Sequence, residues 1–175
     1  MSLAIQPSKG TAVITGASTG IGAIYASRLA HMGYDLIIIA RNHHRLNQMA
    51  SRITADTARN VEVLAVDLAD AQQLSVLEQK LRDDASITLL VNNAGVGTHT
   101  PLLSSDVDQM QAMINLNVVA LTRLTYSVVP GFVARGVGAI INISSIVSLT
   151  LSSLAPAPIL ARVAFQLTLV LTGES

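Results

Sequence analysis

Residues 15–22 read Thr-Gly-Ala-Ser-Thr-Gly-Ile-Gly, and they lie between an expected strand at residues 11–15 and an expected helix that starts near residue 21. Glycine permits a tight turn and lets an anion approach the backbone closely. The free N–H groups at the start of the helix carry a partial positive charge of about half a unit, which favours a phosphate there. The stretch therefore predicts a phosphate-binding turn, with a turn that only packs helix on strand as the alternative.

Strand and helix patterns alternate along the chain on both sides of this turn. Apolar or β-rich runs predict strands at 11–15, 36–39, 61–66, 88–91 and 139–143. Apolar residues at helical spacing predict helices around 21–32, 46–53, 74–81 and 110–132. This alternation indicates βαβ units with right-handed crossovers, which build a doubly wound parallel sheet with helices on both faces. We expect one α/β domain of about five strands over residues 1–175.

Composition and charge narrow the function classes. Of the 175 residues, 50% are hydrophobic and 13% charged, with eleven basic and eleven acidic residues that cancel. A balanced charge of this kind predicts binding neither to nucleic acid nor to an anionic membrane. The chain has no cysteine, which excludes disulfides and thiolate metal ligands, and the His43-His44 pair has no further ligand clustered with it in sequence. We expect a cytoplasmic protein without a metal site.

Three further motifs accompany the glycine-rich turn. Asp67-Leu68 follows the expected third strand, Asn92-Asn93-Ala94-Gly95 follows the fourth, and residues 141–145 read Ile-Asn-Ile-Ser-Ser. With the spacing Gly-x-x-x-Gly-x-Gly that starts at Gly16, and with Asn117 in the long helix, they resemble the short-chain dehydrogenase/reductase family over about residues 8–148. The resemblance implies a three-layer Rossmann fold that binds a nicotinamide dinucleotide at the carboxyl ends of its strands.

The same resemblance implies which residues hold the cofactor. The phosphates are expected to contact Gly16, Ser18, Gly20, Ile21 and Gly22, and the hydroxyl of Thr19 can add a further donor. The adenine is expected to contact Asp67 and Leu68, and the ribose beside it Asn92, Ala94 and Gly95.

Charge at the end of the second strand indicates which dinucleotide binds. An acidic residue there hydrogen-bonds the ribose 2′-hydroxyl of NAD and repels the 2′-phosphate of NADP. This chain has Arg41 at that place, with Arg45 four residues later and no acid in reach. A guanidinium group binds phosphate through its planar fork. NADP is therefore predicted in preference to NAD, with Arg41 as a solvated loop charge as the alternative.

The catalytic pattern that the resemblance implies is incomplete. Family members reduce carbonyls or oxidise alcohols with an Asn, a Ser and a Tyr-x-x-x-Lys motif, and Asn117 and Ser145 match the first two positions. At the usual interval the Tyr position is Pro158 and the Lys position is Arg162. Proline has no transferable proton, and arginine stays protonated near neutral pH. Loss of the general acid removes something like 10²–10⁴ in rate, so we expect weak or absent turnover of a small carbonyl or alcohol substrate.

Other interpretations stay open at this point. His99, in the loop after the fourth strand, is either a substitute proton donor or a loop histidine without a role. The protein is either an oxidoreductase of weak activity, a silent dinucleotide-binding protein that pairs with itself or a complete relative, or an altered product without a function of its own. The nearly uncharged run 146–172, interrupted by Pro156 and Pro158, predicts a buried or partner-facing helix over about 158–171 rather than a membrane span.

The resemblance implies that family members continue with further strands, so we expect the C-terminal part of this chain to be short relative to the family. We therefore expect residues 139–143 to form an exposed sheet edge that needs a cover. The charge-poor fourth and last helices predict a homo-oligomer, because large apolar faces usually pack against a partner.

Overall fold

A six-stranded sheet with the strand order β3-β2-β1-β4-β5-β6 forms the centre of the molecule. The computed structural model describes residues 7–97, 100, 102–144 and 170–172. The strands are β1 (Thr11–Thr15), β2 (Asp35–Ala40), β3 (Val61–Ala65), β4 (Ile87–Asn92), β5 (Val137–Asn142) and β6 (Val170–Thr172). All neighbouring pairs from β3 to β5 are parallel, as the alternating pattern predicts, and β6 pairs antiparallel with β5.

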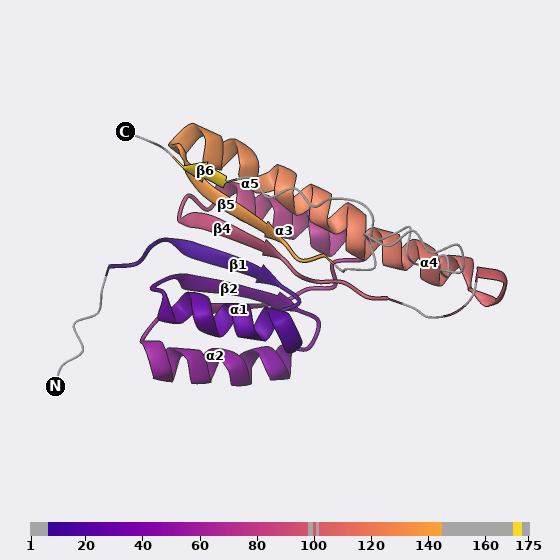
Figure 1. Cartoon of the computed structure of the whole chain (residues 1–175), viewed down its shortest axis with the longest axis horizontal. Coiled ribbons are helices and arrows are strands. Elements are labelled where there is room, and N and C mark those ends of the chain that lie inside the picture. Colours follow the sequence, from indigo (N-terminus) through magenta and orange to yellow (C-terminus); the bar gives the residue numbers. More distant parts are fainter. Residues whose placement is uncertain (1–6, 98–99, 101, 145–169, 173–175) are drawn as a thin grey trace.

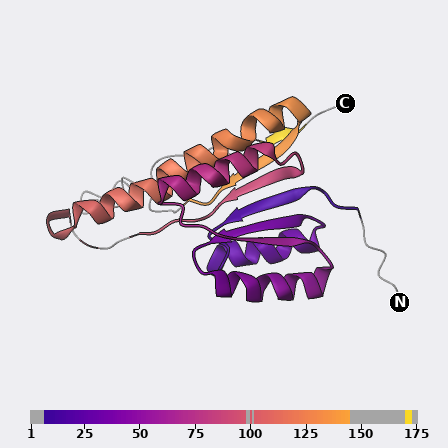
Figure 2. The same cartoon turned by 180° about the vertical axis from the view of Figure 1, so that it is seen from behind.

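Helices cover both faces of this sheet, so the expected three-layer α/β Rossmann fold is confirmed. The helical elements are α1 (Gly20–His31), α2 (His43–Thr57), α3 (Ala71–Asp83), η1 (Leu102–Ser104), α4 (Val107–Ile114), η2 (Asn115–Ala120) and α5 (Leu121–Arg135). α1 and α2 pack on one face, and α3 and α5 pack on the other, while α4 extends beyond the sheet (Figures 1 and 2).

The central strands are apolar over most of their length because both of their faces are buried. Leu36 and Ile38 of β2 belong to the core under α1 and α2. Ile37 and Ile39 point the other way, into the core under α3 and α5. All four side chains are at most 2% exposed. Each such burial stabilises the fold by roughly 1.5–3 kcal/mol, so the run fixes β2 inside the sheet.

The strand order places a crevice at one edge of the sheet. The chain passes from β1 outward to β2 and β3, and it then returns to the other side of β1 to form β4. Helices on opposite faces therefore diverge at the carboxyl ends of β1 and β4. In doubly wound sheets, ligands bind at this point where the strand order reverses.

A continuous helical segment runs from α4 through η2, a π-helical stretch, to α5. The segment Val107–Arg135 is long and apolar enough to cross a membrane, because an 18-residue window within it has a mean hydropathy of 1.3. In the structure, Leu124, Val128 and Phe132 of this segment are buried in the core beside α3. Arg123 donates two hydrogen bonds to the buried Glu78 of α3, and this partner raises the pKa of Arg123. The α5 part of the segment therefore packs beside α3 in the layer on one face of the sheet, rather than standing free.

The structure corrects two expectations about the C-terminal part. The edge expected at 139–143 is covered only at its start, because Val137, Gly138 and Ala139 pair with β6, and among the described residues no strand pairs with 140–142 on that side. The helix expected over about 158–171 does not include its last residues, because Val170 and Leu171 belong to that strand. Apolar β-branched residues favour a strand wherever an unpaired edge offers hydrogen bonds. Residues 158–169 lie outside the described residues.

Candidate functional site

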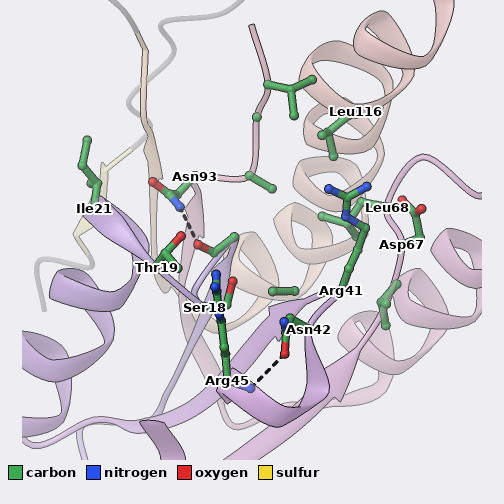
Figure 3. Close-up of a pocket in the computed structure, with 16 residues that line it drawn as sticks. Ser18, Thr19, Ile21, Arg41, Asn42, Arg45, Asp67, Leu68, Asn93 and Leu116 are labelled. Carbon is green, nitrogen blue, oxygen red and sulfur yellow. Dashed lines mark hydrogen bonds between the residues drawn. The ribbon is translucent and has the colours of Figure 1, made fainter. Parts of the chain in front are cut away.

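A cleft of about 750 Å³ opens at the carboxyl ends of β1, β2 and β4, where the strand order reverses (Figure 3). Its wall contains Gly16, Ser18, Thr19, Ile21, Ala40, Arg41, Asn42, Arg45, Val66, Asp67, Leu68, Asn93, Ala94, Gly95, Val96 and Leu116. Nine of these were among the predicted cofactor residues, and they come from four separate segments of the chain. The volume is within the range of about 300–1,000 Å³ that small-molecule sites occupy.

The start of α1 faces this cleft without a cap. The N-cap residue Thr19 makes no side-chain cap hydrogen bond, and the first turn of α1 has no acidic residue. In contrast, Asn42, Asp70 and Asp106 cap α2, α3 and α4 with their side chains. The first N–H groups of a helix have no partner within the helix. At α1 they are therefore left to a ligand, and the helix dipole favours an anion.

Two glycines bring the backbone of the turn into close packing. Gly16 has a φ of +65°, and a Cβ built there would lie 2.8 Å from the Cα of Ala94. A Cβ on Gly22 would lie 2.5 Å from the carbonyl oxygen of Gly16. Any side chain at either position would displace the turn, so the sequence pattern has a steric cause here. The third glycine, Gly20, has a φ of +57° and open space around it.

A hydrogen-bond network joins the turn to the segment after β4. The hydroxyl of Thr15 accepts hydrogen bonds from the backbone N–H groups of Asn93 and Ala94 at 2.9 and 3.0 Å. The side-chain amide of Asn93 donates to the carbonyl oxygens of Thr15 and Gly16 at 2.9 and 3.2 Å. Figure 3 shows Asn93 directed at the turn. Neither side chain was a predicted cofactor residue, although both stand next to predicted ones.

Two positively charged side chains lie on the side of the cleft formed by the end of β2. Arg41 and Arg45 are exposed and line its wall. Asn42 lies between them and accepts a hydrogen bond from the backbone N–H of Arg45 at 3.0 Å, which fixes the start of α2. In Figure 3, Arg45 extends toward Ser18 and Arg41 toward Leu116. The arrangement places positive charge along the cleft between the turn and the far wall, where it suits a phosphate.

Asp67 and Leu68 form the wall that follows β3. Leu68 is 5% exposed and offers an apolar surface. Asp67 is held by its neighbours: its backbone N–H donates to Gln73, and its carboxylate accepts from the N–H of Ala69 at 3.0 Å. A carboxylate can accept several hydrogen bonds, so Asp67 retains capacity toward the cleft. The apolar surface of Leu68 can pack against a purine base, and the carboxylate of Asp67 can accept a hydrogen bond from it.

Three predicted residues lie next to the cleft rather than in its wall. Gly20 and Gly22 belong to the first turn of α1 behind the wall. Asn92 is 4% exposed, and its side-chain amide donates to Thr125 and to Asn142. Its side chain therefore faces α5 and β5, whereas its neighbour Asn93 faces the cleft.

Asn117, a predicted catalytic residue, holds the loop after β4. Its side-chain oxygen accepts from the N–H of Val96 at 3.0 Å, and its side-chain amide donates to the carbonyl of Val96 at 2.8 Å. Both ends of the amide are thus engaged with one backbone residue of the cleft wall. The residue lies in the π-helical stretch η2, a type of irregularity that is frequent at functional sites. Its catalytic role stays a prediction.

The other catalytic positions, Ser145, Pro158 and Arg162, and also His99, lie outside the described residues. Within the residues that the structure describes, no group of three or more His, Asp or Glu side chains could hold a metal ion.

Comparisons with known proteins agree with this geometry. A model of the short chain dehydrogenase family matches residues 10–157. The short-chain dehydrogenase from Sphingobium yanoikuyae, solved in complex with NADPH, superimposes with a TM-score of 0.85 at 39% identity, over 88% of this chain and 61% of that one.

Two human relatives differ in the activity that their names state. The very-long-chain 3-oxoacyl-CoA reductase is 36% identical over 138 residues, which are 77% of this chain and 44% of that protein. The inactive hydroxysteroid dehydrogenase-like protein 1 is 34% identical over 137 residues, which are 77% of this chain and 41% of that protein. The chain spans about half the length of the curated relatives it matches.

Proposed function

The chain belongs to the short-chain dehydrogenase family, and from that membership we propose that it binds NADP(H) in the cleft at the carboxyl ends of β1, β2 and β4. The observation that carries the proposal is the uncapped start of α1, which lies over a turn in which Gly16 and Gly22 have no room for a side chain. A diphosphate fits this place because it accepts hydrogen bonds from free backbone N–H groups.

The rest of the cleft fits the remaining parts of the dinucleotide. Leu68 and Asp67 offer an apolar surface and an acceptor to the adenine, and Ala94 and Gly95 leave room for the adjacent ribose. Asn117 holds this wall in place through the backbone of Val96. When bound, NADPH would supply the hydride for reduction of a carbonyl, and NADP+ would accept the hydride when an alcohol is oxidised.

Charge supports NADP over NAD as the dinucleotide. Arg41 and Arg45 line the wall at the end of β2, and among the described lining residues Asp67, at the end of β3, is the one acid. A hydrogen bond between charged partners contributes roughly 1.5–3 kcal/mol, which corresponds to about tenfold to a hundredfold in affinity. We expect NADPH to bind tighter than NADH by a factor in this range.

We further propose that reduction of carbonyl compounds by this chain is weak or absent. Pro158 and Arg162 replace the Tyr and Lys of the family, and neither replacement can donate a proton near neutral pH. The similarity to an inactive hydroxysteroid dehydrogenase-like protein is compatible with this proposal.

Binding and turnover measured side by side test these proposals. Calorimetric titration of the chain with NADPH and NADH is expected to show binding that favours NADPH. NADPH oxidation with a panel of ketones and aldehydes is expected to stay at the background rate. The variant Arg41→Ala is a matched control that should lose the preference and keep binding. Absence of binding to either dinucleotide contradicts the proposed function.

A homo-oligomer is the second part of the proposal. Val119, Tyr126 and Val133 expose 39%, 74% and 61% of their surface along the outer side of the helix from η2 to α5. Apolar side chains aligned in this way favour a partner. Sedimentation of the wild type and of Tyr126→Asp tests it: we expect an oligomer that the variant dissociates, and a monomeric wild type contradicts it.

A further inference from the structure

The two sides of the domain carry opposite net charge, although the chain as a whole is neutral. Residues 7–60, which build β1, β2 and the α1–α2 layer, contain six basic and two acidic residues. Residues 61–144, which build β3, β4, β5 and the layer of α3, α4 and α5, contain four basic and eight acidic residues. The dinucleotide cleft is lined by residues from both parts. An approaching anion is therefore attracted to one side of the cleft more than to the other.

Four arginines provide much of the charge on the positive side. Arg41 and Arg45 line the cleft, whereas Arg28 of α1 and Arg52 of α2 do not. All four side chains are exposed, and none has a carboxylate partner among the described residues. Because no acid in this part of the chain neutralises them, their field extends into the solvent in front of the cleft.

Arg28 and Arg52 lie too far from the cleft for a direct contact but near enough for a long-range field. Helices α1 and α2 pack on the same face of the sheet (Figures 1 and 2), and both begin at the edge where the cleft opens. Arg28 comes eight residues after Gly20, and Arg52 comes nine residues after His43. At a rise of 1.5 Å per residue, both lie about 12–14 Å along their helices from that edge. This distance is comparable with the Debye length of about 10 Å at 0.1 M ionic strength.

The opposite side of the cleft repels the same ligand. Asp106 caps α4, and Asp108 lies in the first turn of that helix. NADPH carries about four negative charges at neutral pH, two on the diphosphate and close to two on the 2′-phosphate. Repulsion by the acidic side and attraction by the basic side act in the same direction, so approach over α1 and α2 is favoured.

We propose that Arg28 and Arg52 steer NADP(H) to the cleft from the α1–α2 side without touching the bound ligand. The inference rests on the proposed function, because the ligand that is steered is the dinucleotide. It goes beyond that function, since it assigns a kinetic role to two side chains outside the binding site. Steering of this kind raises the association rate constant and depends on ionic strength.

Stopped-flow mixing with NADPH, followed by the fluorescence of the nicotinamide, measures association and dissociation separately. At an ionic strength of about 0.05 M, the double variant Arg28→Glu, Arg52→Glu should lower the association rate constant about threefold to tenfold and leave the dissociation rate constant unchanged. At about 1 M, where the Debye length is about 3 Å, it should associate as fast as the wild type does. Arg41→Ala removes a residue of the cleft wall and should instead raise the dissociation rate constant.

A matched control separates the position of a charge from the net charge. Arg82 is exposed near the end of α3, in the opposite layer. Arg82→Glu and Arg52→Glu change the net charge equally, but Arg82→Glu should slow association less than half as much. The conservative variant Arg28→Lys, Arg52→Lys keeps both charges and should associate at the wild-type rate.

The outcomes distinguish steering from the function on which it rests. Equal losses for Arg52→Glu and Arg82→Glu overturn the inference, because net charge alone then sets the rate. A faster dissociation in the glutamate double variant also overturns it, since the two arginines would then contact the ligand, and so does an unchanged association rate at low salt. NADPH still binds in each of these cases, so the proposed function stands. If NADPH does not bind to the wild type, the proposed function fails and steering fails with it.

Discussion

Helices α1 and α3 begin at the same edge of the sheet, but their N-termini differ in capping. Both follow a parallel strand, and they have 12 and 13 residues. At α3, the carboxylate of Asp70 accepts hydrogen bonds from the N–H groups of Gln72 and Gln73 at 2.9 and 3.0 Å. These bonds, that from Gln73 above all, lower the pKa of Asp70 below its ordinary value. At α1, Thr19 makes no such bond.

This difference shows where the fold can bind an anion. A doubly wound sheet presents several helix starts at one edge, and each one attracts negative charge through its dipole. At α3 the protein supplies that charge itself through Asp70, whereas at α1 it leaves the N–H groups to a ligand. The missing cap at α1, together with the two glycines under it, therefore determines the position of the site.

Giving α1 the kind of cap that α3 has is expected to produce the largest effect. Thr19→Asp places a carboxylate where the diphosphate binds, and repulsion of about 2–4 kcal/mol should weaken NADPH binding on the order of a hundredfold. The same change should raise the free energy of unfolding of the ligand-free chain by about 0.5–1 kcal/mol. Calorimetry and urea unfolding measure the two effects.

Thr19→Asn separates charge from capping, since it offers a cap oxygen without the negative charge. We expect it to weaken NADPH binding much less than Thr19→Asp. Equal losses for the two variants would mean that charge at this helix start does not matter.

Filling the space under the first turn of α1 is expected to have the next largest effect. Gly22→Ala places a Cβ 2.5 Å from the carbonyl of Gly16, so the turn must move. We expect the free energy of unfolding to fall by about 2 kcal/mol and NADPH binding to weaken. Gly20→Ala is the control, because its Cβ has open space and its cost, about 1 kcal/mol, comes from the positive φ alone. A smaller loss at Gly22 than at Gly20 would contradict the steric account.

Removing the hydroxyl of Thr15 should produce a moderate effect on the same region. Thr15→Val keeps the shape of the side chain but leaves the N–H groups of Asn93 and Ala94 without their acceptor. We expect a loss of about 1 kcal/mol in the free energy of unfolding and a few-fold weaker binding of NADPH. Thr15→Ser retains the hydroxyl and should behave much more like the wild type; if both variants bind equally weakly, the network has no such role.

The smallest effect is expected at the capped helix α3, and it depends on pH. The pKa of Asp70 is lower in the folded protein than its ordinary value of 3.8. Its charge therefore stabilises the fold above that value, and the contribution is lost as the pH falls through the folded pKa. Asp70→Asn should thus lower Tm slightly at pH 7, and the difference from the wild type should shrink as the pH falls through the folded pKa of Asp70. NADPH affinity should not change; a clear decrease would mean that α3 takes part in binding.

Most of the fold can be predicted from the sequence, because buried faces of strands and helices require apolar residues at regular positions. The run Leu36–Ile39 is apolar at every position since β2 is covered on both faces, and the periodic apolar residues of α5 bury Leu124, Val128 and Phe132. The three residues of β6 show no such pattern. They form a strand because they pair with the edge of β5, and hydrogen bonds between distant segments do not appear in the local sequence.

The candidate site was predicted by segment more reliably than by side chain. The glycine-rich turn, Arg41 and the segment after β4 all border the cleft. Asn92 and Asn93 are adjacent identical residues, but Asn92 is the last residue of β4 and its side chain faces α5, whereas the side chain of Asn93, just after the strand, faces the cleft. The register of β4 decides which of the two faces the ligand, and the sequence does not contain that register.

Asn117 illustrates a role that only the three-dimensional structure reveals. Its two hydrogen bonds to Val96 join residues 21 positions apart. Asn117 lies in the π-helical stretch η2, for which the apolar periodicity of residues 110–132 gives no signal. Such contacts between distant segments arise from packing of the whole domain.

The most direct test of the central claim is a titration of the ¹⁵N-labelled chain with NADPH, followed by NMR of the backbone amides. The amides of Gly20, Ile21 and Gly22 at the start of α1 are expected to shift strongly. Those of Gln72 and Gln73, which Asp70 already holds, are expected to stay in place. If NADPH binds without shifting the amides of α1, or shifts both helix starts alike, the diphosphate does not bind at the uncapped helix.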